Sequence, residues 1–380
     1  MGARNLNAEP RSYVPPPHGG EWSRALSEAA GFDPSRLADA TAFAQARETP
    51  WPIDLRSAIE GGFFEPPPEN EIIGPTAPRG APNGVVLRGG RIVASWGDTR
   101  RADMTFSVAK SYLSLLTGLA LGDGLIASLD EPVRRTVEDG GFEGRNAAIT
   151  WRHLLQQTSE WEGPLWGKPD AIDRNRVLGR DNTGLPPRDR GRELRAPGTF
   201  WEYNDVRVNR LSLALLRLFR RALPDIFAER IMRPIGASGD WRWEGYRNSF
   251  VELDGNRLAS VPGGGHWGGG VFIHAEDQAR IALLAARDGM WGGERILPAG
   301  WMAASRTPCP IAPDYGFLWW LNTGRMKYPA ATEQSFFALG TGGNICWIDP
   351  ETDIVAAVRW IDPFAMNGFI EKVMGAQARA

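Results

Sequence analysis

Apolar and polar positions follow two periods along this chain, one typical of helices and one typical of strands. Helical spacing of apolar residues covers four segments, at 25–48, 54–61, 209–223 and 277–289. Alternation on both sides of Gly89-Gly90 predicts a hairpin over 84–96, because two glycines suit a two-residue turn. A second strand–turn–strand pattern surrounds Asp349–Thr352 and leads into a helix from about residue 363.

The order of these segments predicts the fold class. Strand patterns lie toward both ends of the chain, and residues 107–121, apolar nearly all round, predict a central buried helix between them. We therefore expect an α+β fold, in which an antiparallel sheet flanked by helices carries an inserted, mainly helical subdomain. The expected boundaries are a flexible tail at 1–20, a sheet subdomain at 21–115 and 255–380, and a helical subdomain at 116–254.

Two irregular segments interrupt this pattern. Residues 167–200 are charged and rich in Pro, Gly and Arg, which is typical of a lid or binding loop. Residues 262–274 are dense in glycine and lead into a short strand. Both segments are candidates for shaping a pocket.

Composition and charge exclude several functional classes. The chain has 380 residues, 42% of them hydrophobic, and a formal net charge of −2, which gives no field that would attract nucleic acid or an anionic membrane surface. No apolar run reaches the roughly 18 residues of a membrane span, and the N-terminus has no signal-peptide core, so we expect a cytoplasmic protein. Cys309 and Cys346 form either one bridge or two free buried thiols, not a disulfide framework.

The most informative motif is Ser107-Val108-Ala109-Lys110, the only S-x-x-K in the chain. Residues three apart share a helix face, so this spacing brings a hydroxyl and an amine within hydrogen-bond reach at a positively polarised helix N-terminus. An activated serine nucleophile needs this arrangement. The competing interpretation is a capped helix with an exposed lysine.

Two further motifs accompany it in a characteristic order. Trp201-Glu202-Tyr203-Asn204-Asp205 follows Pro197-Gly198-Thr199, and Gly340-Thr341-Gly342-Gly343-Asn344 lies in a predicted strand near the C-terminus. With the flanking segments 115–133 and 149–163, this set resembles the serine β-lactamase and penicillin-binding-protein superfamily, which carries S-x-x-K, Y-x-N and K-T-G. The resemblance covers roughly residues 84–376. It is closest to the class C-like branch of family VIII-type carboxylesterases and 6-aminohexanoate-dimer hydrolases.

The resemblance implies a role for each motif. Ser107 would be the nucleophile, and the backbone N–H groups of Ser107 and Gly343 would stabilise the oxyanion. Tyr203 and Lys110 would move protons, with Tyr203 as our expected general base. Asp205, Thr341, Gly342, His266 and Trp267 are the candidate substrate-binding residues.

Two departures from the family pattern matter for the substrate. Asp205 occupies the Asn position of Y-x-N, where a carboxylate should favour the ammonium form of Lys110. Asp205 could instead only position Lys110, or the register could place Asn204 in the site. Gly340 replaces the lysine of K-T-G, which argues against anionic substrates. We therefore expect a neutral or cationic ester or amide.

Together, these motifs predict a serine hydrolase of carboxylic esters or linear amides that works through an acyl-enzyme. Four alternatives stay open: a β-lactamase, a D-alanyl-D-alanine carboxypeptidase, a transacylase and a non-catalytic binding relative. The expected partner is a small molecule, with no nucleic acid and no membrane, and the oligomeric state is open. The four histidines show no metal-ligand spacing, so we expect no metal and no other cofactor. We expect His153 to have a structural role.

Overall fold

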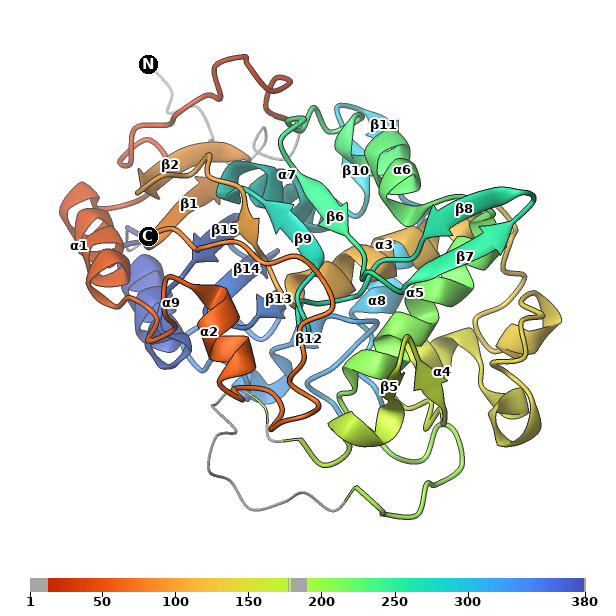
Figure 1. Ribbon diagram of the computed structural model, residues 1–380. Helices are drawn as coiled ribbons and strands as arrows, with labels where there is room; N and C mark the ends of the chain where they lie inside the picture. Colours follow the sequence, from red (N-terminus) through yellow and green to blue (C-terminus); the bar gives the residue numbers. More distant parts are fainter. Residues whose placement is uncertain (1–12, 177, 179–189, 379–380) are drawn as a thin grey trace.

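A six-stranded antiparallel sheet forms the centre of the molecule, in the order β12-β13-β14-β15-β1-β2 (Figure 1). The computed structural model describes residues 13–176, 178 and 190–378. The helices are α1 (Pro34–Ala46), α2 (Leu55–Glu60), α3 (Val108–Gly122), α4 (Trp151–Leu155), α5 (Asp205–Phe219), α6 (Leu223–Phe227), α7 (Ala275–Ala286), α8 (Trp301–Ser305) and α9 (Met366–Gly375). The central strands are β1 (Asn83–Arg88), β2 (Arg91–Trp96), β12 (Trp320–Leu321), β13 (Phe336–Gly340), β14 (Asn344–Asp349) and β15 (Ile354–Arg359).

Shorter strands make up the remaining sheets. A three-stranded sheet, β3-β9-β6, contains β3 (Asp103–Met104), β6 (Arg242–Glu244) and β9 (Gly270–Ile273). Three two-stranded pairs are β4 (Pro164–Leu165) with β5 (Lys168–Pro169), β7 (Phe250–Leu253) with β8 (Asn256–Ala259), and β10 (Met290–Trp291) with β11 (Glu294–Arg295). Several of these strands lie inside the segment that we expected to be mainly helical.

Helices cover both faces of the central sheet. The α1–α9 pair lies on one face, where Phe369 contacts Trp96 with ring centres 5.6 Å apart. Helix α7 and the start of α3 lie on the other face, where Arg359 of β15 donates to the carbonyls of β3 and β9. This layered α/β arrangement, with a sheet built from both ends of the chain, confirms the predicted fold class.

Most predicted elements are present with shifted ends. The hairpin at 84–96 is β1–β2, and the buried helix at 107–121 is α3, whose residues from Val108 to Ala120 are all buried. The helix predicted over 25–48 begins only at Pro34, because Asp33 caps it and proline suits the first helical position. The predicted subdomain boundaries stay a prediction.

The ends of the chain and the cysteines complete the description. The tail predicted at 1–20 lies largely outside the described residues, although His18 donates its backbone N–H to Gly236 at 2.7 Å. Cys309 and Cys346 are both free and buried. Among the described helices, none combines the length and apolar content needed to cross a bilayer.

Candidate active site

Ser107 lies at the N-terminus of α3, where the chain makes a strained turn. Phe106, directly before it, has a left-handed backbone conformation (φ 48°) that residues other than glycine rarely adopt. Aromatic packing holds Phe106 in place, with Trp51 5.2 Å and Phe64 6.2 Å from its ring centre. The Ser107 hydroxyl makes no capping hydrogen bond to the helix backbone. It is therefore available for another partner.

That partner is Lys110, one helical turn later. Lys110 Nζ lies 2.8 Å from Ser107 Oγ, and the lysine side chain is only 2% exposed. The competing interpretation of this motif, a capped helix with an exposed lysine, is therefore wrong. Burial lowers the pKa of Lys110, because Asp205, which raises it, does not offset the desolvation of the ammonium.

Tyr203 and Asp205 come from the segment that enters α5. Asn204 caps α5 by accepting from the Arg207 N–H at 3.1 Å, and its amide donates to the Asp170 carbonyl, so Asn204 does not face the site. The next residue, Asp205, points its Oδ1 at Lys110 Nζ, 2.5 Å away. Burial together with the Asp205 charge raises the pKa of Tyr203 above its usual value, and the nearby Ser107 hydroxyl opposes this.

Arg176 is a site residue that sequence reasoning missed. Its Nη2 lies 2.7 Å from Asp205 Oδ2, and its Nη1 lies 3.0 Å from Asp173 Oδ1. One carboxylate is thus shared between a lysine and an arginine. Although burial alone would raise it, Lys110 and Arg176 hold the pKa of Asp205 well below its usual range. The signal was available as Asp173-x-x-Arg176, a helical ion-pair spacing inside the predicted binding loop at 167–200.

His266 joins this network from the glycine-dense loop. Its Nδ1 lies 3.3 Å from Asp205 Oδ2, and its Nε2 lies 3.2 Å from Glu65 Oε1. The predicted candidate His266 therefore does reach the site, where it lines the cavity and also supports Asp205 from behind. Gly264 passes even closer, since a Cβ at this position would lie 3.3 Å from Ser107 Oγ.

One cluster resembles a metal site. Donor atoms of Glu65, Asp173 and His266 all lie within 4.8 Å of one another. The guanidinium of Arg176 already contacts Asp173 and His266 from inside this cluster. A permanent positive charge therefore contacts two of the three candidate ligands, which opposes binding of a cation there, and we assign no metal to these residues.

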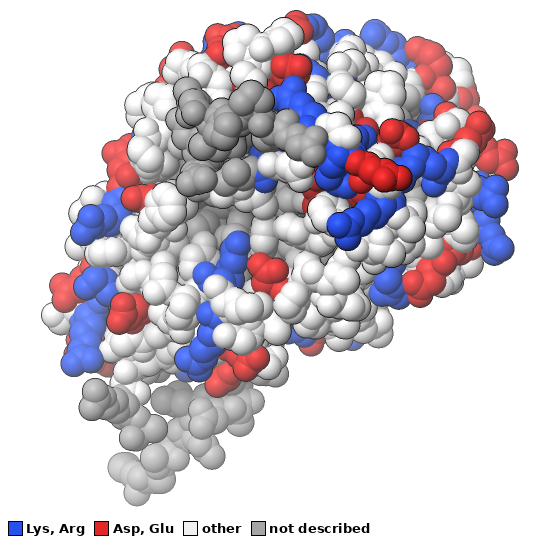
Figure 2. All heavy atoms as spheres, turned by 90° about the horizontal axis from the view of Figure 1, so that it is seen from below, with Lys and Arg blue, Asp and Glu red and all other residues white. Residues whose placement is uncertain are grey.

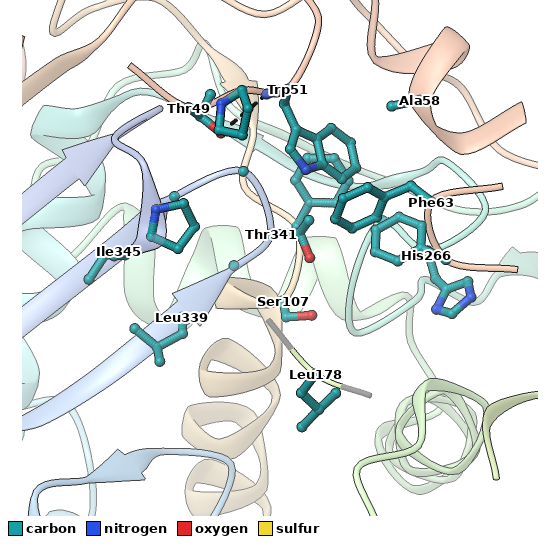
Figure 3. Close-up of a pocket in the computed structure, with 18 of the residues that line it drawn as sticks. Thr49, Trp51, Ala58, Phe63, Ser107, Leu178, His266, Leu339, Thr341 and Ile345 are labelled. Carbon is teal, nitrogen blue, oxygen red and sulfur yellow. Dashed lines mark hydrogen bonds between the residues drawn. The ribbon is translucent and has the colours of Figure 1, made fainter. Parts of the chain in front are cut away.

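A cavity of about 680 Å³ opens above Ser107 (Figure 3). The close-up shows Ser107 at the end of α3, with Phe63 and His266 to one side and Leu339 and Ile345 on the strands to the other. Aromatic side chains from 49–64 form one wall, a contribution that the sequence did not reveal. The face in Figure 2, turned by 90°, carries interspersed positive and negative residues without a large patch of either sign.

The third motif lies on the β13–β14 turn. Our prediction that it lies within a strand is therefore wrong. Strand β13 ends at Gly340, and Thr341, Gly342 and Gly343 connect it to β14. All of them line the cavity. Gly343 has a φ of 76°, and a Cβ there would lie 1.6 Å from the Ile361 carbonyl oxygen, so only glycine fits.

Two of the remaining candidates lie away from the reacting atoms. Trp267 is fully buried and does not line the cavity. Its indole Nε1 donates to the Glu69 carbonyl at 2.8 Å. His153 closes a capping box with Thr150 at the start of α4, in line with the structural role expected for it.

The layered sheet, with a serine and a lysine one turn apart on a buried helix below a cavity, defines a protein of the serine β-lactamase and penicillin-binding-protein superfamily. The family model described as Beta-lactamase matches residues 84–360, and the chain belongs to this family.

Solved structures resemble the chain in fold at low sequence identity. A family VIII carboxylesterase is 15% identical with a TM-score of 0.59, covering 93% of this chain and 99% of its own. A penicillin-binding protein homologue from Caulobacter crescentus is 15% identical (TM-score 0.59; 91% and 99% covered). A hydrolase with promiscuous acyltransferase activity is 17% identical (TM-score 0.56; 91% and 99% covered). No protein with a curated description matches.

Proposed function

We propose that this protein is a serine hydrolase of carboxylic esters or linear amides that works through an acyl-enzyme on Ser107. The observation that carries the proposal is the 2.8 Å contact between Lys110 Nζ and Ser107 Oγ at the floor of a cavity lined mainly by apolar residues. Membership of the Beta-lactamase family agrees with it. The contact supplies a nucleophile with a proton acceptor already in reach.

We infer the proton transfers from the directions of the pKa shifts. Desolvation favours the neutral amine of Lys110, so Lys110 takes the Ser107 proton as Oγ attacks the carbonyl carbon. Tyr203 keeps its proton, because its pKa is raised, and therefore acts as the donor to the leaving group. Lys110 then returns a proton to Tyr203. This assignment reverses our sequence-based expectation that Tyr203 is the base.

The remaining steps need an oxyanion site and a water molecule. The Ser107 N–H at the start of α3 and a backbone N–H of the β13–β14 turn, with Gly343 as the candidate, stabilise the oxyanion. Collapse of the tetrahedral intermediate breaks the bond to the leaving group and leaves an ester on Ser107 Oγ. Water then attacks that ester and Lys110 accepts the water proton. As the bond between the acyl carbon and Ser107 Oγ breaks, Lys110 passes this proton to Oγ, so Ser107 is released as the alcohol and the acyl group leaves as the carboxylic acid.

The test uses p-nitrophenyl butyrate and a fluorophosphonate probe. We expect the wild type to release p-nitrophenol and Ser107→Ala to lose this activity to the background rate. Mass spectrometry of the probe-labelled wild type should place the adduct on the peptide that contains Ser107. Activity that survives in Ser107→Ala, or labelling at another residue, would overturn the proposal, and an unlabelled wild type would favour a non-catalytic binding relative.

Acyl transfer is the second candidate, and the apolar lining of the cavity favours it. An acyl-enzyme in such surroundings is exposed to an organic acceptor as well as to water. The measurement is the ratio of butyl butyrate to butyrate formed from p-nitrophenyl butyrate in the presence of 1-butanol. A transacylase gives mostly the new ester, and a hydrolase gives mostly the acid.

A further inference from the structure

A second lysine reaches the cavity from an element that the three motifs do not include. Lys327 follows β12 and lines the same cavity as Ser107. Its ammonium lies 3.6 Å from the centre of the Trp320 ring, on which it makes a cation–π contact. The sequence offered no reason to single out this residue among the four lysines.

None of the described charged residues around the cavity forms an ion pair with Lys327. Of the other charged residues that line it, Arg176 pairs with Asp205, and Asp362 accepts the Phe364 N–H at 3.0 Å. Within the part of the chain that the structure describes, no carboxylate lies within 4.0 Å of the Lys327 ammonium. Burial lowers the pKa of Lys327, with Asp314 opposing this from a greater distance. An anionic ligand beside Lys327 would raise this pKa again and stabilise the ammonium form through a charge-assisted hydrogen bond.

Neighbouring rings indicate which part of the substrate lies near Lys327. The Trp320 ring stacks on Tyr203 with centres 5.7 Å apart and an angle of 23°. A single indole ring therefore separates Lys327 from the group that protonates the leaving group in the proposed mechanism. The aromatic residues of 49–64 form a wall without a charged side chain, which suits an apolar acyl group.

We propose that Lys327 binds an anionic group, such as a carboxylate, on the leaving-group side of the substrate. This inference rests on the proposed function and names its substrate class. It replaces the expectation of a neutral or cationic substrate, which depended on Gly340 and on a free charge at Asp205. The structure instead shows Asp205 in contact with both Lys110 and Arg176, and a separate lysine in the cavity wall.

The test compares two butyrate esters that differ in one charge. One has 4-hydroxybenzoate as leaving group and the other 4-hydroxybenzamide, and kcat/KM is measured for both in the wild type, in Lys327→Met and in Lys327→Arg. We expect the charged-to-neutral ratio of kcat/KM to fall about 10-fold or more in Lys327→Met, the size typical of losing one charge-assisted contact. Lys327→Arg should keep most of the ratio. Because each ratio is taken within one variant, differences in folded fraction cancel.

A binding measurement separates this inference from the proposed function. Calorimetry with 4-hydroxybenzoate and 4-hydroxybenzamide on Ser107→Ala, with and without Lys327→Met, requires no turnover. Selective binding of the benzoate that disappears with Lys327→Met supports the inference, even if Ser107 proves not to be the nucleophile. An equal ratio in wild type and Lys327→Met, or equal binding of the two compounds, would overturn it. A preference for a charge on the acyl chain instead would also contradict it.

Discussion

Arg176 Nη2 and Asp205 Oδ2 lie 2.7 Å apart, so the carboxylate that contacts Lys110 also contacts a guanidinium. Asp205 raises the pKa of Lys110, while the positive charge of Arg176 lowers it. The two residues therefore act on the proposed base in opposite directions. The protonation state of Lys110 reflects this balance on top of its burial, which is the largest influence.

Substitution of Arg176 and substitution of Asp205 should shift the pH profile of kcat/KM in opposite directions. Because Lys110 must be neutral to act as base, log kcat/KM rises with pH through the Lys110 pKa. Arg176→Gln removes a charge that lowers this pKa, so the rising limb moves to higher pH. Asp205→Asn removes a charge that raises it, so the limb moves to lower pH. The measurement is kcat/KM for p-nitrophenyl butyrate between about pH 5 and 10.

Arg174→Gln is the matched control for this pair. Arg174 lies two residues from Arg176 and pairs with Asp170, not with Asp205. Its loss should leave the rising limb where the wild type has it, although stability can fall. Limbs that move the same way in Arg176→Gln and Asp205→Asn would show that Lys110 is not the titrating base.

Gly264→Ala should reduce catalysis more than stability. A Cβ here would lie 3.0 Å from Asp205 Oδ1, 3.1 Å from Lys110 Nζ and 3.3 Å from Ser107 Oγ, so the polar groups must shift by a few tenths of an ångström. Because a misplacement of about 1 Å can cost about 100-fold, we expect this smaller shift to lower kcat by up to about 10-fold. Gly239→Ala, where a Cβ meets nothing within 4 Å, is the control for kcat and for the melting temperature. Equal kcat in both variants would contradict the geometry.

Gly343→Ala should destabilise the fold itself. The new Cβ would lie 1.6 Å from the Ile361 carbonyl oxygen, and the backbone φ of 76° suits glycine. We expect the free energy of unfolding to fall by about 3 kcal/mol or more, the range of severe steric substitutions. Urea unfolding followed by circular dichroism measures it. Gly375→Ala at the end of α9, with open space around its Cβ, should change stability by less than about 1 kcal/mol.

Phe63→Ala should weaken the preference for long acyl groups. Phe63 lines the cavity and contacts Trp51 with ring centres 4.4 Å apart. Each methylene that is buried against such a wall contributes about 0.8 kcal/mol at most. The increase of log kcat/KM along p-nitrophenyl acetate, butyrate and hexanoate should therefore be steeper in the wild type than in the variant. Phe250→Ala, on the β7 strand and outside this cavity, should keep the slope of the wild type.

Local patterns in the sequence predicted the fold well, because periodicity and turn chemistry are themselves local. Gly89-Gly90 placed the first hairpin, and the apolar run after Ser107 placed the buried helix, with ends that differ by one residue or less. The spacing of S-x-x-K also predicted the Ser107–Lys110 contact, since one helical turn determines it. The third motif was misplaced because its glycines form a turn that the strand pattern does not reveal.

Contacts between distant segments could not be predicted in the same way. Arg176 meets Asp205 only after residues 170–176 fold back onto α5, and Lys327 meets Tyr203 only through Trp320. The pKa directions also depend on burial, which the sequence does not give. Asp205 raises the pKa of Lys110, as the sequence led us to expect, but burial, which the sequence does not give, lowers this pKa by more.

The aromatic wall at 49–64, together with Glu65 behind His266, has a consequence for how such enzymes diversify. This stretch precedes residue 84, where the match to the family model begins, whereas the serine, the lysine and the tyrosine all lie within that match. The aromatic wall of the cavity and the residues of the proposed bond-breaking chemistry thus lie on separate lengths of polypeptide. A substitution within residues 49–64 can change which acyl groups fit the cavity without altering Ser107, Lys110 or Tyr203. We therefore expect an exchange of residues 49–64 between relatives to change the acyl-group preference.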